Sequence, residues 1–301
     1  MSSDSVFKCS IMVVVILSLI LISPPFVSSE EAELVGTEVR ITSEIEDDMT
    51  PVIYGNRILW TKRTAWDSDV CMYDIETKEE TRIASSDYAE YSPNIYEDTV
   101  VWVDTRHGNP DIYMYDLETE IKTRVSRSPD NDVFPSIHEN KIVYTRMNDD
   151  TWNVILYDID TREETELTLN ITGDPGGPED PDAYEFYPEV YGSKVVYAGF
   201  RYGTVDVFLY DLDNGTETRI TREEDFRYAH SIYENRVLIS GSDDIFLFDL
   251  ETWTMTRITD DEYDAFACGI ESPAVTDTRC DELEAAGMSF EARALNLPSI
   301  S

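Results

Sequence analysis

The sequence predicts an all-β fold, a β-propeller with four-stranded antiparallel blades, from three features that recur along the chain. A short apolar run ending in aspartate is preceded by a second apolar run and followed by a Thr-Arg or Thr-Glu segment. The five aspartates recur at nearly regular intervals, with one longer interval before the fourth, at Asp74, Asp116, Asp158, Asp211 and Asp249. Repeats of about 40 residues that each hold four short strands are typical of propeller blades.

Each repeat holds four segments, A to D in chain order. Segment A begins with proline in four copies and with His230 in the fifth, at Pro51, Pro93, Pro135 and Pro188. Segments B and C are continuous apolar runs, which predicts strands covered on both faces. Segment D alternates polar and apolar residues, as expected of a half-exposed outer strand.

Short turns join these segments. Residues 54–57 and 191–194 are tight A-to-B turns, and an aspartate opens each C-to-D turn. Because aspartate side chains accept hydrogen bonds from backbone amides that follow them, we expect the five recurring aspartates to cap turns rather than to bind a ligand.

The number of blades is open between five and six. Residues 38–42 form an extra D-type segment before the first repeat, and residues 263–270 begin a repeat that then degenerates. A ring of five blades and a ring of six with a hybrid last blade both fit, and five is slightly favoured.

Residues 111–119, Asp-Ile-Tyr-Met-Tyr-Asp-Leu-Glu-Thr, are followed by Lys-Thr-Arg-Val and preceded by Ser-Pro-Asn-Ile-Tyr at 92–96. Together with Val-Val-Trp-Val-Asp-Thr-Arg at 100–106, these segments resemble the TolB-type, WD40-like propeller repeats of exported prokaryotic surface proteins. The resemblance favours an archaeal source for this chain. The resemblance covers about residues 37–259 and implies a fold rather than a function. The 301 residues leave no space for the additional N-terminal domain of TolB, so its envelope partners are not expected here.

The N-terminus predicts export. Lys8 precedes an apolar run at 11–22, and small residues up to Ser29 follow it, which is the order of a secretory signal peptide. We expect a signal peptide at 1–29, with an uncleaved membrane anchor through residues 6–27 as the alternative. The propeller then spans 30–262, and 263–301 form a degenerate tail that could complete the last blade. The protein is therefore expected to be secreted or on the cell surface.

The charge restricts the partners. Asp and Glu number 62 against 23 Lys and Arg, which gives a formal net charge of -39. Such a chain repels nucleic acid and anionic lipid, so a protein or glycan of the cell envelope is the expected partner. The acidic excess also suits a salty exterior, where charge repulsion is screened.

Cysteines and sequons fit an exported chain. Cys71 occupies an apolar strand position, which predicts a buried thiol. In an oxidising environment Cys268 and Cys280 are expected to form a disulfide. Asn170 and Asn214 begin sequons and are expected to be glycosylated in surface loops.

By analogy with other propellers, the D-to-A and B-to-C loops share the functional face. The B-to-C loops carry arginine and aromatic residues, which dominate binding hot spots. The expected binding residues are Arg63, Trp66, Arg106, His107, Trp152, Arg201 and Tyr202. The alternative is that these side chains pack against neighbouring blades.

The D-to-A loops are acidic, which predicts carboxylates around the mouth of the central channel, with Asp48, Asp132 and Glu185 as representatives. No cofactor is expected. Ca²⁺ is the one alternative, because residues 67–69, 148–150 and 243–244 offer oxygen ligands, but none has the spacing of an EF-hand loop.

A catalytic set is not evident, because the three histidines are scattered and no nucleophile elbow is present. The sequence therefore predicts a non-enzymatic, exported binding scaffold. Two alternatives stay open: a carbohydrate-active hydrolase that uses the channel-mouth carboxylates, and a purely structural envelope component.

Overall fold

The computed structural model describes residues 12–15, 37–42, 48–64, 67–147, 152–168, 187–201, 204–222, 227–241, 244–259, 265–271, 274–280 and 290–296. Every regular element in these ranges is a β-strand. Five antiparallel four-stranded sheets follow one another along the chain, so the predicted propeller with four-stranded blades is confirmed. We call these sheets blades 1 to 5.

The strands of each blade are consecutive hairpins. Blade 1 holds β3 (Asp48–Tyr54), β4 (Arg57–Arg63), β5 (Ser68–Asp74) and β6 (Glu79–Ala84). Blade 2 holds β7 (Glu90–Tyr96), β8 (Thr99–Asp104), β9 (Asp111–Asp116) and β10 (Ile121–Arg124). Blade 3 holds β11 (Asn131–His138), β12 (Lys141–Met147), β13 (Trp152–Asp158) and β14 (Glu163–Glu166). Blade 4 holds β15 (Glu189–Tyr191), β16 (Lys194–Arg201), β17 (Thr204–Asp211) and β18 (Thr216–Arg219). Blade 5 holds β19 (Tyr228–Tyr233), β20 (Arg236–Ser240), β21 (Ile245–Asp249) and β22 (Thr254–Arg257).

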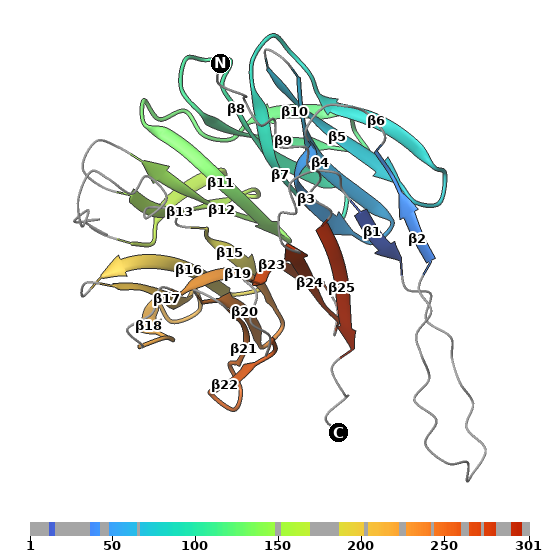
Figure 1. Ribbon diagram of the computed structural model, residues 1–301. Helices are drawn as coiled ribbons and strands as arrows, with labels where there is room; N and C mark the ends of the chain where they lie inside the picture. The colour runs from blue at the N-terminus through green and yellow to red at the C-terminus, as the bar shows by residue number, and fades with distance from the viewer. Residues whose placement is uncertain are drawn as a thin grey trace, which may run out of the picture.

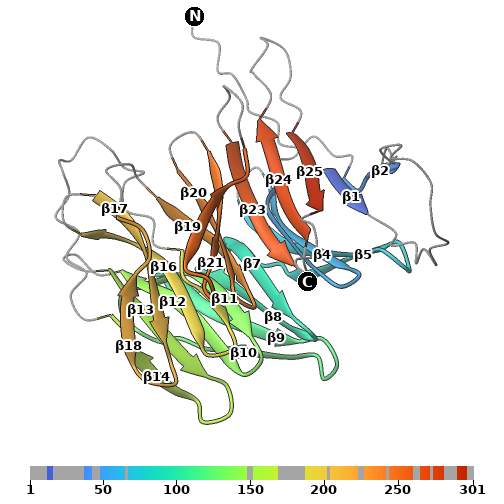
Figure 2. The ribbon, with the colours of Figure 1, turned by 90° about the horizontal axis from the view of Figure 1, so that it is seen from below.

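The tail adds a three-stranded sheet of β23 (Ala265–Glu271), β24 (Ala274–Cys280) and β25 (Phe290–Asn296). Each first strand of blades 1 to 4 contacts the first strand of the next blade, while β23 contacts both β19 and β3. The inner strands therefore form a cycle around a centre, and the tail sheet lies between blade 5 and blade 1 (Figures 1 and 2).

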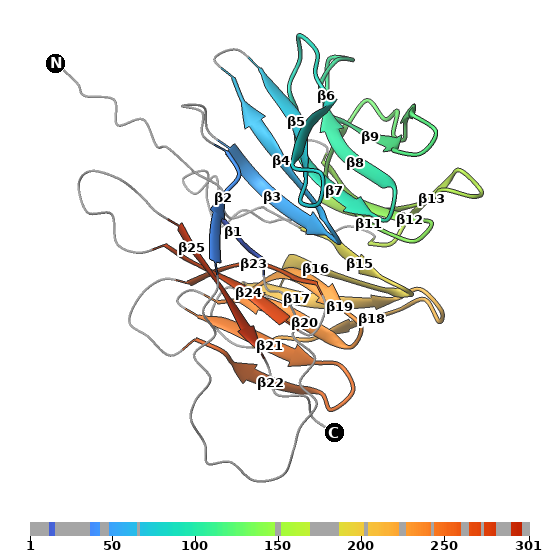
Figure 3. The same ribbon diagram turned by 90° about the vertical axis from the view of Figure 1, so that its right-hand side faces the viewer.

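Two short strands precede blade 1. β1 (Met12–Val15), from the predicted signal segment, pairs with β2 (Thr37–Arg40), and β1 contacts β25 of the tail sheet. Both strands lie beside the tail sheet in Figure 3. No helix long and apolar enough to cross a membrane occurs in the described residues.

The hydrophobic core is divided into layers between neighbouring blades. The layer between blades 2 and 3, for example, joins Val103 and Ile112 to Ile142 and Tyr157. Large side chains on the second strands of the first four blades are fully buried in these layers, at Trp60, Trp102, Tyr144 and Tyr197. Burial on both faces explains why the B and C segments are continuous apolar runs.

The recurring aspartates cap turns, as predicted. The Oδ1 atom of Asp116 accepts hydrogen bonds from the amides of Glu118 and Thr119 at 3.0 and 2.7 Å. These bonds hold the pKa of the Asp116 carboxyl below its ordinary value. The last turn residue has a positive φ in all five blades, at Lys78, Glu120, Arg162, Gly215 and Trp253.

In four of the five blades, an ion pair between a buried or largely buried aspartate and an arginine joins the third and fourth strands. The aspartate precedes its arginine by the same sequence spacing in every pair. The N–O distances are 2.5–2.9 Å in the pairs Asp69–Arg82, Asp111–Arg124, Asp206–Arg219 and Asp244–Arg257. In blade 3 the equivalent positions hold Asn153 and Glu166. Asn153 has a buried Oδ1 atom without a hydrogen-bond partner among the described residues.

Candidate functional site

The described part of the predicted binding face is built from the ends of the second strands and the loops that follow them. Arg63 ends β4, Arg106 and His107 follow β8, and Trp152 opens β13. Arg201 ends β16. Trp66 and Tyr202 lie outside the described residues.

A cleft of about 470 Å³ lies between blades 1 and 2 on this face. Arg63 lines it and is exposed, and no ion pair joins its guanidinium to a described residue. Tyr91 forms part of the wall, and burial raises the pKa of its phenol. The remaining wall is rich in hydroxyl groups, which come from Thr50, Thr61, Thr64, Ser68 and Ser92.

Two β-bulges shape the floor of this cleft. Thr50 and Ser92 have φ values of 48° and 51°, and the register of β3 and β7 shifts at these points. The Thr50 and Thr61 hydroxyls lie 2.8 Å apart, and the amide of Ser92 donates to Thr61 Oγ1 at 3.1 Å. Because Thr61 bonds to both blades, the cleft has a fixed floor.

Hydrogen bonds join Thr64 to Asp67, next to Arg63. The amide of Thr64 donates to the carbonyl of Asp67 at 2.9 Å, and the amide of Asp67 donates to Thr64 Oγ1 at 3.1 Å. Thr64 also donates to the Asp67 carboxylate. The Asp67 side chain is thereby occupied within its own loop, which leaves Arg63 as the cation available to a ligand.

Arg106 and His107 differ in how accessible their side chains are to a ligand. Arg106 turns into blade 2, where it binds both oxygens of Asp104 and lies 3.3 Å from Glu90 Oε1. Asp104 and Glu90 face each other on paired strands and both are fully buried, so Arg106 neutralises a like-charge pair. His107 is exposed, and its Nε2 lies 2.8 Å from the Tyr113 hydroxyl.

Trp152 is half-buried. It packs against the layer between blades 3 and 4, which contains Val154, Val190 and Val195. Trp152 therefore follows the alternative interpretation, in which the side chain packs against a neighbouring blade.

The prediction of carboxylates around the channel mouth is corrected for two of its three representatives, Asp48 and Asp132, because both side chains are buried. Asp48 and Asp132 are only 3% and 0% exposed, while Glu185 lies outside the described residues. Register explains the difference, because Asp48 pairs with Lys62 and Asp132 with Arg146 on the neighbouring strand. Arg146 binds both Asp132 oxygens, at 2.8 and 3.2 Å. Burial nevertheless raises the pKa of both carboxyls.

The proposed calcium ligands are also engaged elsewhere. Asp69 and Asp244 bind Arg82 and Arg257, and Asp67 binds Thr64. Residues 148–150 and Asp243 lie outside the described residues. Within the described ranges, no three His, Cys, Asp or Glu side chains are placed to hold a metal ion.

The cysteine predictions have different outcomes. Cys71 is a buried free thiol as predicted, and burial raises its pKa to about 12. Cys268 and Cys280 lie on β23 and β24, but Ala267 pairs with Asp277, which places the two cysteines three to four residues apart along the sheet. That is roughly 10–13 Å, whereas a disulfide spans at most about 7 Å between Cα atoms, so this register excludes the predicted bridge.

Of the two sequons, Asn170 lies outside the described residues. Asn214 is exposed in the β17–β18 turn, where its Nδ2 donates to Asp211 Oδ2 at 3.0 Å. The expected surface position of the Asn214 sequon is therefore confirmed, and its glycosylation stays a prediction.

Sequence reasoning missed an arc of aromatic rings at the opposite ends of the inner strands. The centroids of neighbouring rings are 4.2–5.3 Å apart along the series Tyr54, Tyr96, His138, Tyr191 and Tyr233. The signal was one aromatic ring at the same position of every repeat. The His138 Nδ1 accepts the amide hydrogen of Gly192 at 3.1 Å, which joins blade 3 to blade 4.

No family model and no curated protein matches the chain. Similar solved structures include TolB from Acinetobacter baumannii, at 18% identity over 74% of this chain and 60% of that one, with a TM-score of 0.56. A putative TolB from Agrobacterium tumefaciens matches at 13% identity over 74% and 84%, with a TM-score of 0.59. The propeller domain of the Trilobed protease from Pyrococcus furiosus matches at 13% identity over 83% and 82%, with a TM-score of 0.58. Peptidases are also among the similar structures.

At these identities the likeness shows the fold alone, and it supports a TolB-type β-propeller. The chain spans 60% of the Acinetobacter baumannii protein. Activities and partners therefore have to be argued from the residues of this chain.

Proposed function

We propose that the chain is a non-enzymatic binding scaffold on the outside of the cell, which holds a protein or glycan partner in the cleft between blades 1 and 2. The observation that carries this proposal is the exposed Arg63 guanidinium, without a described acidic partner, on a cleft of about 470 Å³. Small-molecule sites occupy cavities of this order.

The lining favours a glycan. Hydroxyls of Thr50 and Ser92 can donate to or accept from sugar hydroxyls, and Arg63 can donate to a ring oxygen or to an acidic substituent. Tyr91 adds an aromatic ring, a residue type enriched at binding hot spots. The fixed floor around Thr61 lowers the ordering cost of binding.

The buried carboxylates support binding over hydrolysis. A glycosidase needs two carboxyl groups that flank the scissile bond and reach the substrate. Asp48 and Asp132 belong to different blades, and each is buried opposite a cation on its neighbouring strand. Such side chains contribute to blade structure rather than to a substrate site.

The location outside the membrane rests on the predicted signal peptide at 1–29 and on the acidic composition. No nucleic-acid partner is expected for a chain of net charge -39. A tether through residues 6–27 is the alternative to full secretion.

The proposal is tested by capture from an envelope fraction, using the tagged exported chain, with bound proteins and glycans identified by mass spectrometry. We expect Arg63→Gln to lose the captured component. The control Lys78→Asn removes a cation from the distant turn of the same blade and should capture normally. Equal capture by both variants would show that this cleft is not the binding site. Repeating the capture with a calcium chelator tests whether binding requires Ca²⁺.

A further inference from the structure

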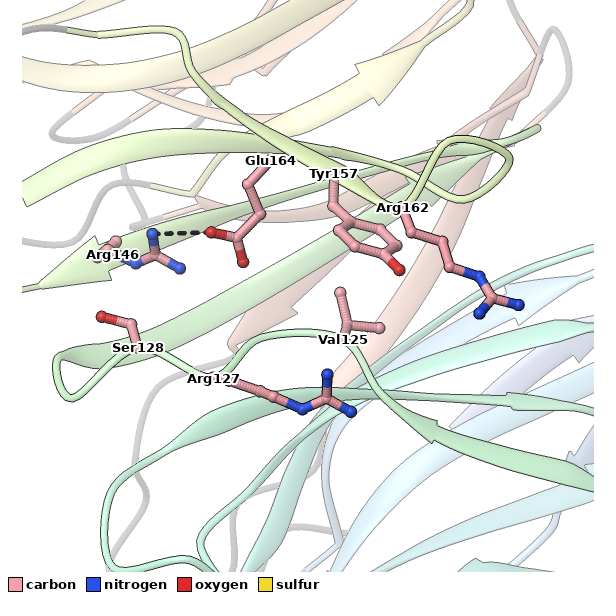
Figure 4. A pocket seen from close by; sticks show the side chains of 7 residues that line it. All are labelled: Val125, Arg127, Ser128, Arg146, Tyr157, Arg162 and Glu164. Atoms are coloured by element: carbon pink, nitrogen blue, oxygen red, sulfur yellow. Dashed lines mark hydrogen bonds and ion pairs between the residues drawn. The ribbon is translucent and has the colours of Figure 1, made fainter.

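A second cleft, of about 400 Å³, lies between blades 2 and 3 (Figure 4). Its walls come from the segment after β10 and from β12, β13, β14 and the β13–β14 turn. Three arginines line it, Arg127, Arg146 and Arg162, together with a single aliphatic residue, Val125. Such a concentration of cations is unexpected in a chain with 62 acidic and 23 basic residues.

The three arginines are not equivalent. Arg146 is engaged by Asp132 and donates to Glu164 Oε2 at 3.0 Å. Arg127 and Arg162 are exposed, and neither has an ion pair or a hydrogen bond from its side chain to a described residue. In Figure 4 both guanidinium groups extend toward the side of the cleft where the Tyr157 hydroxyl points. Two positive charges in this cleft are thus available to a ligand.

Two other interfaces between neighbouring blades show whether the propeller fold requires these arginines. Arg127 and Arg162 occupy repeat positions that hold Ser85 and Glu120 between blades 1 and 2. Between blades 4 and 5, the same positions hold Arg222 and Trp253. Because the fold is preserved at those interfaces without paired arginines, propeller structure does not require the pair.

The remaining polar groups fit a hydroxylated ligand. Ser128 and Tyr157 present hydroxyl groups to the cleft, and the described residues offer the Tyr157 hydroxyl no hydrogen-bond partner. Glu164 supplies carboxylate lone pairs beyond its bonds to Tyr144 and Arg146. Guanidinium groups recognise oxyanions, while hydroxyl and carboxylate groups recognise sugar hydroxyls.

We propose that the cleft between blades 2 and 3 binds an acidic sugar unit, with its oxyanion on Arg127 and Arg162 and its hydroxyls on Ser128, Tyr157 and Glu164. A cleft of about 400 Å³ is at the lower end of the range for small-molecule sites, which suits one or two sugar rings. This site is separate from the cleft beside Arg63 and does not depend on it.

The negative charge of the whole molecule does not prevent such binding. At physiological ionic strength the Debye length is about 8 Å, so distant carboxylates are screened while the two arginines in the cleft are not. We therefore expect binding at about 0.15 M salt and weaker binding at very low salt, where repulsion by the net charge extends further.

The test is calorimetric titration of the full exported chain with trigalacturonate, with its neutral methyl ester and with hexa-aspartate, at about 0.15 M NaCl. We expect trigalacturonate to bind and the methyl ester to bind at least about tenfold more weakly, because charged hydrogen bonds are lost. Arg127→Gln and Arg162→Asn should each weaken trigalacturonate binding about tenfold. Asparagine suits position 162, where φ is 60°.

Arg222→Gln is the matched control, since Arg222 occupies the repeat position of Arg127 at another interface, and it should bind as the native chain does. Equal binding of the acid and its ester, or equal loss with Arg222→Gln, would overturn the proposal. Tighter binding of hexa-aspartate than of trigalacturonate would identify an acidic-peptide site and overturn the sugar assignment. Arg63→Gln should leave this titration unchanged, which separates it from the first cleft.

Discussion

Asp111 and Arg124 face each other across β9 and β10 of blade 2, with 2.8 Å between Arg124 Nη2 and Asp111 Oδ2. The aspartate is completely buried, and the arginine side chain is 24% exposed. The same pair, with the same spacing in the sequence, recurs in blades 1, 4 and 5. It fastens the outer strand to the body of the blade.

Removal of one partner from such a pair leaves a buried charge without compensation. We expect Arg124→Ala to lower the free energy of unfolding by about 2–3 kcal/mol, less than for a fully buried pair because the arginine is partly hydrated. Chemical denaturation measures the change. An effect below about 0.5 kcal/mol, the usual range of surface substitutions, would show that the pair does not fasten the strand.

Blade 3 offers the reverse experiment. Asn153→Asp alone places an acid next to Glu166 and should destabilise, whereas Asn153→Asp combined with Glu166→Arg builds the pair found in the other four blades. We expect a favourable coupling energy of about 1–3 kcal/mol in the double-mutant cycle. Additive single effects would contradict this expectation.

The turn aspartates should contribute through their backbone bonds. Asp116→Ala removes the acceptor for the amides of Glu118 and Thr119, and we expect denaturant unfolding to show a loss of about 1 kcal/mol by analogy with helix caps. Asp116→Asn keeps an acceptor and should lose less. Because the pKa of Asp116 is lowered in the folded state, its contribution is present at neutral pH and declines as the pH falls through that lowered pKa.

His138 should make stability depend on pH. Burial lowers its pKa from the ordinary 6.5, outweighing the opposing carboxylates Glu139 and Glu97. The unfolded chain then binds protons more readily, so the free energy of unfolding should decrease as the pH falls below about 6.5. His138→Tyr, the residue at this position in the other four blades, should reduce that decrease between about pH 7.5 and 5. Parallel pH profiles of the two proteins would rule out this role.

The thiols give a simple check of the tail sheet. We expect non-reducing peptide mapping to recover Cys268 and Cys280 as separately alkylated peptides, because the β23–β24 register holds them too far apart. Cys71 should react only after unfolding, since its thiol is buried and its pKa is about 12. A cross-linked peptide that joins Cys268 to Cys280 would show that the tail pairs in another register.

Much of the fold was predictable because its strands and turns depend on residues that are close together in the sequence. Continuous apolar runs mark strands covered on both faces, and the aspartate at each C-to-D turn accepts hydrogen bonds from backbone amides two or three residues further along the chain. The positions of Asp48 and Asp132 were not predictable from their loops. Their burial depends on register, which sets each acid opposite a cation on the returning strand of its hairpin.

The two clefts could not be predicted from the sequence for a related reason. Arg127 and Arg162 lie in different repeats and belong to neighbouring blades, so only blade packing brings them together. Arg63 was identified because the sequence predicts it in a B-to-C loop of the binding face, and the structure places it at the end of β4, next to that loop. The hydroxyl groups of Thr50 and Ser92, in contrast, depend on β-bulges at two positive-φ residues.

The most direct test of the binding proposal is hydrogen–deuterium exchange of the full chain with and without the component captured from the envelope. We expect slower exchange in residues 61–64, 67–68 and 89–92, the described segments that line the cleft beside Arg63, and no change at the distant turn around Lys78. Protection confined to other blades, with these segments unchanged, would contradict the assignment of this cleft as the binding site.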